Sequence, residues 1–439
     1  MAPSVLSSLP IASDWLDRLP NPVYLVGGSV RNWLLKEHLG WDPDGSMGKL
    51  DLDLVVEGDA LQWAANLARY LQGGYVVLDE QRHIARVVLP DLTLDIAQQA
   101  GSSLEADLYQ RDFTCNAIAL ELHSGKRLDP LEGYADLCQH RLRMVHPDNL
   151  TADPLRLLRA YRQAAQLRFD LDPPTQEAIR QRGSLLQQVA GERVRTEISY
   201  LLAKQQQGLY WLGQAWSDGI LTDWLPFLSA ASFQVAEQAM SRLPELSANY
   251  ASSFLPLQHP LTDQRTGLIT LWLAALCLPE GISLAEMDAA LLHLKYSRIE
   301  RQWMQKLKTL TPQLQTLAIA APPASQIYLF FQAAGSLFPA IALLAHAYGL
   351  SACHLIPWLE RYHNPHDRLA HPVALLDGHQ LIEFLGLPSG RWVGSLLTAI
   401  RLAQATGEIQ TQEEALGYAQ AWVTNPANQG SLLQNRQKT

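Results

Sequence analysis

Short runs in which apolar and polar residues alternate mark the first 145 residues of the chain. A period of two is typical of strands that bury one face, because successive side chains point to opposite sides of a sheet. Two stretches with helical spacing lie among these runs. The runs predicted to be strands are residues 23–28, 50–56, 75–79, 83–89, 92–97 and 117–122. The pattern therefore predicts an α+β region built around a small sheet.

From about residue 148 onward, the apolar positions follow the period of helices. Leu155, Leu158 and Tyr161 recur at helical spacing after Pro154, a residue that suits the first turn of a helix. A second helix is predicted over Glu192–Ala203, and amphipathic helical patterns continue toward the C-terminus. The predicted fold class is therefore α+β, with a small sheet head followed by an all-helical neck, body and tail. The predicted boundaries are 1–147 for the head, 148–205 for the neck, 206–366 for the body and 367–439 for the tail.

The composition is that of a globular protein. The chain has 439 residues, of which 48% are hydrophobic and 18% charged, enough for several domains with a substantial core. Its four cysteines are far apart and form no CxxC pair, so neither a disulfide framework nor a zinc site is predicted. A reducing cytoplasm fits this usage. The N-terminal stretch lacks a basic region and a long apolar core, so no signal peptide is expected.

Two apolar stretches are the candidates for a membrane segment. Leu268–Leu278 is too short to span a bilayer, and Ile327–Leu350 is interrupted by Gln332, Pro339 and His346. We expect both to be buried helices, and we predict no membrane partner.

The formal net charge of −9 is unevenly distributed. Residues 141–204 contain eleven Lys and Arg against seven Asp and Glu, a local charge of +4 that leaves −13 for the remainder. A locally basic segment can dock a phosphate backbone even within an acidic protein. A solvated helical face would show the same excess.

Asp51 and Asp53 carry the clearest chemical signal. Two residues apart on a predicted strand, they place both carboxylates on one face of the sheet. Like charges held so close repel each other, and hard oxygen ligands near a phosphate favour Mg²⁺. We therefore predict that Asp51 and Asp53 are catalytic and bind the metal. Asp95, on the predicted strand at residues 92–97, is a tentative third ligand, and a buried or strand-capping role is the alternative.

The upstream turn fits the same chemistry. Gly27 and Gly28 lie between an apolar strand and a helix-like run, where backbone N–H groups at a helix start can approach a phosphate. Arg31 lies beside this turn and can add a charged donor. Together with the carboxylates, these residues predict phosphoryl chemistry on a nucleotide.

These residues resemble the first motif of the tRNA CCA-adding enzyme and bacterial poly(A) polymerase family. Further stretches resemble the family's other motifs in the same order. They are RDFTCNAIAL at residues 111–120, DPLEGYADL at 129–137, ADPLRLLRAYR at 152–162, ERVRTE at 192–197 and a tail element at 375–397. Chance does not plausibly produce this series.

The resemblance implies a template-independent nucleotidyltransferase that extends the 3′ end of tRNA with CTP, with ATP as a possible second substrate and Mg²⁺ as cofactor. It also implies residue roles. Arg111 would contact the nucleotide, and Asn116 would shape its pocket. The pair matching Asp153 and Arg156 would select the base, and the positions matching Arg159 and Arg162 would contact the triphosphate.

Asp153, Arg156, Arg159 and Arg162 follow one another at intervals of three, which keeps neighbours close if all four lie on one helix. A carboxylate accepts from an exocyclic amine, and a guanidinium donates to a ring nitrogen or carbonyl, so an Asp/Arg pair can read the edge of a base. A helix face stabilised by ion pairs is the alternative interpretation.

Two departures from the family pattern bear on which nucleotides are added. Ala152 stands where the family usually has a Glu that orients the arginine, which makes the base preference less certain. Residues 98–110 cross an interval where the family typically carries a longer, charged, flexible loop that helps reshape the pocket from CTP to ATP. Members without that loop resemble CC-adding enzymes, which need a separate A-adding enzyme to complete the CCA end. We therefore predict addition of CC, with complete CCA addition left open.

Rival functions share many of these features. An A-adding enzyme or a bacterial poly(A) polymerase has every motif described, and the short interval argues against both. A tRNA-binding protein with an inactive head would be expected to have lost Asp51, Asp53 or Arg111, and all three are present.

Overall fold

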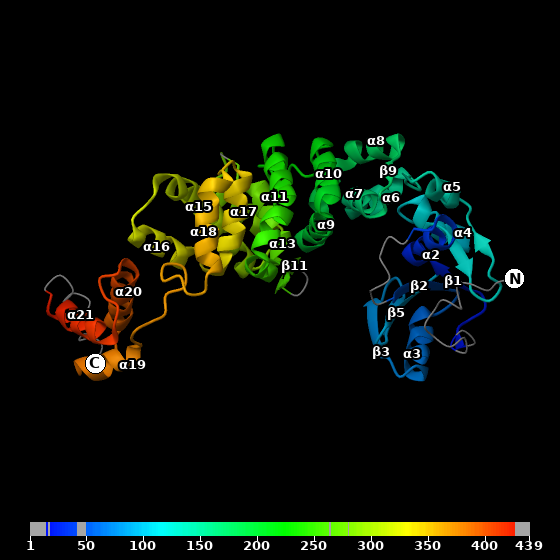
Figure 1. Ribbon diagram of the computed structural model, residues 1–439. Helices are drawn as coiled ribbons and strands as arrows, with labels where there is room; N and C mark the ends of the chain where they lie inside the picture. Colours follow the sequence, from blue (N-terminus) through cyan, green and yellow to red (C-terminus); the bar gives the residue numbers. More distant parts are fainter. Residues whose placement is uncertain (1–14, 16–17, 42–49, 263–264, 280, 426–439) are drawn as a thin grey trace. The chain divides into compact units, whose positions relative to one another are not determined.

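The computed structural model describes residue 15 and residues 18–41, 50–262, 265–279 and 281–425 (Figure 1). The chain forms two compact units, Met1–Pro226 and Phe227–Thr439. The first unit contains the sheet and the first helices of the chain, and the second is almost entirely helical. The predicted α+β class, with a sheet head followed by helices, is confirmed. The finer division at residues 147, 205 and 366 stays a prediction.

A mixed seven-stranded sheet forms the core of the head. Its order is β3-β4-β5-β2-β1-β6-β7; β2 and β5 run parallel, and the other neighbouring pairs are antiparallel. All six predicted strands are present. The strands are β1 (Val23–Val26), β2 (Leu50–Val56), β3 (Gly74–Asp79), β4 (Ile84–Val88), β5 (Leu92–Gln98), β6 (Ala119–Glu121) and β7 (Arg127–Leu128).

Side chains of the central strand β2 alternate between the buried core and the opposite face of the sheet. Leu52 and Leu54 are buried, whereas Asp51 and Asp53 are exposed on the opposite face. Helix α2 (Gly27–Leu39) follows β1 directly and packs against β2, which places the start of the helix beside these carboxylates. The remaining helices of the head are α3 (Ala60–Tyr70), α4 (Leu104–Leu108) and α5 (Gly133–Cys138).

Five helices complete the first unit. They are α6 (Pro147–Ala152), α7 (Leu155–Leu167), α8 (Pro173–Arg182), α9 (Gly191–Ala203) and α10 (Gln205–Ser217), with the short strands β8 (Arg141–Leu142) and β9 (Asp170–Leu171) beside them. Helix α7 packs against both α9 and α10. The buried Tyr161 of α7 donates a hydrogen bond to Asp218, which also accepts from Gln176 and Arg180 of α8. These contacts hold the arginine-bearing helix α7 in a fixed orientation within the unit.

The second unit is a set of packed helices with one short hairpin, β10 (Pro260–Thr262) and β11 (Arg265–Thr266). The helices are α11 (Ala230–Asn249), α12 (Ala251–Phe254), α13 (Gly267–Cys277), α14 (Leu284–His293), α15 (Arg298–Ala320), α16 (Ala324–Ala334), α17 (Phe338–Ala347), α18 (Ala352–His363), α19 (Gly378–Leu385), α20 (Arg391–Thr406) and α21 (Gln412–Thr424). The last three enclose a small core of their own around Leu381, Trp392 and Leu396.

One helical stretch of the described chain, Ala324–Ala347, is long and apolar enough to cross a membrane, with a mean hydropathy of 1.8. It is interrupted at Gly335, whose φ of 52° and ψ of −137° end α16. About 67% of its apolar window is buried inside the unit, as in the core helix of a globular protein. This agrees with the prediction that the apolar stretches are buried helices.

The backbone around Gly133, at the start of α5, leaves no room for a methyl group. A Cβ added at Gly133 would lie 2.1 Å from the carbonyl oxygen of Thr114, in the turn that carries Asn116. Gly133→Ala should therefore lower the free energy of unfolding by about 1–3 kcal/mol, the usual cost of overpacking. Denaturant unfolding followed by circular dichroism would measure the change.

The matched control is Gly417→Ala in α21, where an added Cβ meets no atom within 4 Å in the described structure. It should be neutral or stabilising by up to about 1 kcal/mol, because alanine favours helix over glycine. Equal unfolding midpoints for the two variants would contradict the steric argument.

Candidate active site

Asp51 and Asp53 face a cavity of about 1090 Å³ in the first unit. Its walls come from the β1–α2 turn, β2, the β3–β4 turn, the segment after β5, and helices α6 and α7. The two carboxylates share this wall because they are two residues apart on one strand. The period-two prediction for this pair is therefore confirmed.

The surroundings of Asp53 are short of positive charge. Burial by the cavity walls, together with the charges of Asp95 and Asp51, raises the pKa of its carboxyl to about 6, although Arg111 and Arg86 oppose the increase. The side chain still opens to the cavity. Two carboxylates with surplus negative charge on an open wall are a donor set that suits a hard divalent cation.

Asp95 lies beside Asp53 in register on the parallel strand β5. Both of its oxygens accept from Arg86 of β4, at 2.7 and 2.8 Å. Among the described residues, no group of three or more His, Cys, Asp or Glu side chains is arranged to hold a metal. The geometry gives Asp95 a charge-pairing partner, and the tentative assignment as a third ligand gains no support from it.

The β1–α2 turn approaches the carboxylates closely. Gly27 has a φ of +71°, and a Cβ there would lie 3.0 Å from Oδ2 of Asp53 and 3.4 Å from Nη1 of Arg111. Helix α2 begins at this glycine without a side-chain cap. The hydroxyl of Ser29 donates to the carbonyl of Asp51 at 2.7 Å and so ties the helix start to β2. Uncapped N–H groups at a helix start beside a metal-binding pair suit a phosphate.

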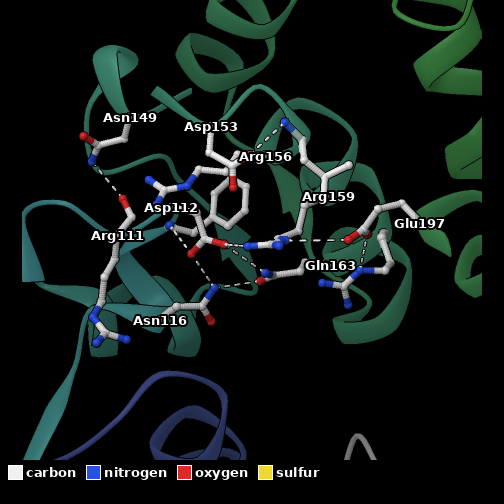
Figure 2. A network of polar contacts seen from close by, with 12 residues as sticks. Arg111, Asp112, Asn116, Asn149, Asp153, Arg156, Arg159, Gln163 and Glu197 are labelled. Carbon is white, nitrogen blue, oxygen red and sulfur yellow. Dashed lines mark hydrogen bonds and ion pairs between the residues drawn. The ribbon is translucent and has the colours of Figure 1, made fainter. Parts of the chain in front are cut away.

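A buried polar network connects α2 to α7, and Figure 2 shows its part around Asp112, Asn116 and Gln163. Arg31 donates through Nη1 to Oδ1 of Asn116 at 2.6 Å. The amide nitrogen of Asn116 donates to Asp112 and to Gln163, each at 2.9 Å. The pKa of Asp112 is lowered: burial opposes ionisation, but the charge of Arg159 and the bond from Asn116 outweigh it. Gln163 was absent from the predicted site, although its helical spacing from Arg159 was a usable signal.

Arg111 is held at the edge of the cavity. Its guanidinium donates to Oδ2 of Asp107 at 3.1 and 3.3 Å, and its carbonyl accepts from Asn149 at 2.8 Å. Its charge acts on Asp53 across the site. This position, next to the carboxylates and Gly27, suits a group that binds phosphate oxygens.

Each of the three arginines of α7 is held by a neighbouring polar group, and Figure 2 labels two of them, Arg156 and Arg159. Arg156 donates to the carbonyl of Gln110 at 2.8 Å; its Nε is buried without a partner in the described structure, and burial lowers the pKa of the guanidinium. Arg159 lies between Asp112 at 3.5 Å and Glu197 at 3.7 Å, and Arg162 also donates to Glu197. Arg156 therefore keeps donor capacity for a ligand.

Asp153 is not on the helix that its spacing predicted, and that part of the sequence interpretation is wrong. It follows α6 with an extended backbone, φ −133° and ψ 92°, and α7 begins only after Pro154. The reason is steric, since a residue before proline is disfavoured in the helical region. Asp153 nevertheless lines the same cavity as Arg156. Its carboxylate accepts from Leu155 N and pairs with Arg193 of α9, both Oδ atoms lying 3.4 Å from Nη2.

The short segment at residues 98–110 is folded onto the site. Ser103 caps α4 by accepting from Ala106 N, and Asp107 accepts from the backbone N–H of Ala100 at 3.0 Å. The segment ends at Gln110, whose carbonyl holds Arg156. The family usually has a Glu at the position of Ala152, and that Glu orients the arginine of the base-reading pair. In this chain, Arg156 is instead held by the backbone carbonyl of Gln110.

The comparisons with known proteins agree with the geometry. Residues 23–143 match the model of the poly A polymerase head domain, and residues 168–232 match that of the probable RNA and SrmB-binding site of polymerase A. A CC-adding tRNA nucleotidyltransferase of Synechocystis is 39% identical over 92% of this chain and 94% of its own length. An A-adding tRNA nucleotidyltransferase of Deinococcus radiodurans is 30% identical over 93% of this chain and 97% of its own length.

Solved structures show the same fold. A Thermotoga maritima CCA-adding enzyme complexed with tRNA aligns with a TM-score of 0.66 at 24% identity, covering 91% of each chain. The solved structures establish the fold, and the sequence identity to the curated relatives, 39% and 30%, also establishes the family. The motifs occur in the family's order, and the sequence identity to the curated relatives extends over more than nine tenths of the chain. This chain therefore belongs to the tRNA nucleotidyltransferase and poly(A) polymerase family.

Proposed function

We propose that this protein adds two C residues to the 3′ end of tRNA, using CTP without a nucleic-acid template and releasing pyrophosphate. The observation that carries the proposal is the composition of one cavity. A carboxylate pair, a phosphate-binding turn and an Asp/Arg pair line the same space of about 1090 Å³. These are the groups that a nucleotidyl transfer with protein-based choice of the base requires.

The residues divide the reaction among them. The 3′ hydroxyl of the RNA attacks the α-phosphorus of CTP, and the bond to the bridging oxygen of the β-phosphate breaks to release pyrophosphate. The N–H groups at Gly27 and Gly28, with Arg31 and Arg111, bind the triphosphate and offset the charge of the leaving group. Asp51 and Asp53 would hold Mg²⁺, which supplies charge neutralisation at the phosphorus and a more acidic attacking hydroxyl.

Asp153 and Arg156 select the base. The exocyclic amine of cytosine donates to a carboxylate, and a guanidinium donates to the ring nitrogen and carbonyl of the same edge. Uracil offers a carbonyl where cytosine has the amine, so the carboxylate of Asp153 disfavours it. Arg159 and Arg162, farther along α7, bind the triphosphate.

The choice of CC addition rests on residues 98–110 and on the relatives. The segment is compact, with five residues between the end of β5 and the start of α4, and it fixes Arg156 through Gln110. A site held in one arrangement suits one kind of nucleotide. A separate A-adding enzyme then completes the CCA end. Because one relative is an A-adding tRNA nucleotidyltransferase, addition of A to tRNA is the second candidate activity.

The partners follow from this activity. They are the 3′ end of tRNA and CTP, with ATP as a possible second nucleotide. The four cysteines are free thiols, which fits action in a reducing cytoplasm.

Extension of a tRNA that ends at its discriminator base tests the proposal most directly. With CTP and ATP both present, we expect a product that stops at two added nucleotides, resolved on a sequencing gel. The control substrate is a tRNA that already ends in CC, which should remain unextended with ATP. A third added nucleotide would make this a complete CCA-adding enzyme, and extension of the control substrate alone would favour A addition.

The carboxylates have a separable role in chemistry. Asp51→Ala and Asp53→Ala should each lower kcat on the order of 10³-fold or more, because the metal contributes several kcal/mol of transition-state stabilisation. Binding of tRNA, measured by filter retention, should remain within about twofold. Asp91→Ala, at an exposed carboxylate in the turn before β5, is the matched control and should retain activity. Retained activity of either site variant would overturn the metal assignment.

The raised pKa of Asp53 predicts how metal binding responds to pH. Below its pKa of about 6 the carboxyl is protonated and uncharged, so affinity for a divalent cation should fall about tenfold per pH unit there and level off above pH 7. Titration calorimetry with Mn²⁺ between pH 5 and 8 would show this. Asp53→Asn should bind weakly with a flatter profile. An identical profile in that variant would assign the dependence to another group.

A further inference from the structure

Two charged residues of helix α9 contact side chains that line the cavity. Arg193 and Glu197 are four residues apart and so lie on one face of the helix. Neither lines the cavity, yet each contacts residues that do. Such residues act on a ligand only through their partners, which makes them positioning residues.

Arg193 holds the residue that reads the base. Its Nη2 lies 3.4 Å from both Oδ1 and Oδ2 of Asp153. Asp153 sits in the extended break between α6 and α7, where helix geometry does not fix its direction. Among the described residues, its carboxylate accepts one further hydrogen bond, a local one from Leu155 N at 3.3 Å. The guanidinium of Arg193 is thus the long-range contact that orients this carboxylate.

Glu197 holds a different pair. It is buried, with 5% of its surface exposed, and it accepts from Arg162 while lying 3.7 Å from Arg159 (Figure 2). A buried carboxylate shared by two guanidinium groups fixes both and limits their rotation. In the described part of the chain, its polar contacts are with the two arginines that the proposed function assigns to the triphosphate and not with Asp153 or Arg156.

We propose that α9 positions the nucleotide site in two separate ways: Arg193 sets base selection through Asp153, and Glu197 sets the grip on the triphosphate through Arg159 and Arg162. The inference rests on the proposed function, because it takes Asp153 as the base reader. Arg156 is oriented by the carbonyl of Gln110, and Arg193 orients Asp153, the other member of the base-reading pair.

Direct binding of nucleotides separates the two roles. We would measure CTP, UTP and inorganic triphosphate by titration calorimetry on the full chain without tRNA. Arg193→Ala should weaken CTP about two- to fivefold, the range of an exposed ion pair, and lower the preference for CTP over UTP by a similar factor. Its affinity for inorganic triphosphate should not change. Arg193→Lys should restore part of the preference, because it keeps the charge without the planar guanidinium.

Glu197→Gln should give the opposite pattern. We expect affinity for CTP, UTP and inorganic triphosphate to fall by one common factor, with the preference for CTP over UTP unchanged. The amide keeps the size of the side chain, and Glu197→Asp provides a second variant that keeps the charge if Glu197→Gln unfolds. Arg127→Ala, at an exposed arginine on β7 outside the cavity, is the control for loss of an arginine and should behave as the unsubstituted protein.

A double-mutant cycle tests whether Arg193 acts through Asp153. Arg193→Ala should add nothing to Asp153→Ala in the affinity for CTP, because the carboxylate that it orients is gone. Additive losses would overturn the inference, as would an equal loss of inorganic triphosphate binding in Arg193→Ala. Unsubstituted protein that binds CTP and UTP equally would contradict the proposed function as well. A preference for CTP over UTP that is unchanged in Arg193→Ala would contradict the inference alone.

Discussion

The negative charge that Asp51, Asp53 and Asp95 bring to one partly buried wall is the constraint on which the site depends. Strand alternation places the carboxylates of Asp51 and Asp53 on one wall of a concave cavity, where burial and the nearby Asp95 already raise the pKa of Asp53 to about 6. Such an arrangement requires positive charge from outside the pair. Arg86 neutralises Asp95, and Arg111 stands beside Asp53. In the proposed function, a divalent cation and the donors of the β1–α2 turn would supply the remaining positive charge when a triphosphate binds.

Around that centre, the structure fixes cationic groups without neutralising all of them. Asp107 holds Arg111, Asn116 holds Arg31, and the carbonyl of Gln110 holds Arg156. Arg111 and Arg156 are each oriented by a partner and still have donors that a ligand can use. A guanidinium has five N–H groups, so one or two bonds to protein leave several for phosphate or base. Orientation in advance reduces the entropy that binding would otherwise cost.

The groups that the proposed function assigns to the base and to the triphosphate come from neighbouring elements that are held by different contacts. Helix α7 is held by the Tyr161–Asp218 bond and by Glu197, so its arginines move with a packed helix. Asp153 lies in the break before that helix, and a side-chain contact with Arg193 sets its direction. In the proposed function, a change at Arg193 would therefore alter the base preference without lowering the affinity for the triphosphate.

Local periodicity in the sequence was sufficient for much of this protein. It located all six predicted strands, the shared face of Asp51 and Asp53, the glycine turn at the start of α2 and the helical spacing of the three α7 arginines. These features depend on residues within a few positions of each other, and backbone geometry alone relates them. Asp153 shows the limit, because Pro154 removes it from the helix that the same spacing predicted. The pairing of Asp95 with Arg86, the contacts of Asn116 with Gln163, and the roles of Arg193 and Glu197 were decided only by tertiary structure. The last of these contacts join residues about 35 to 47 positions apart, and packing determines which distant charges meet.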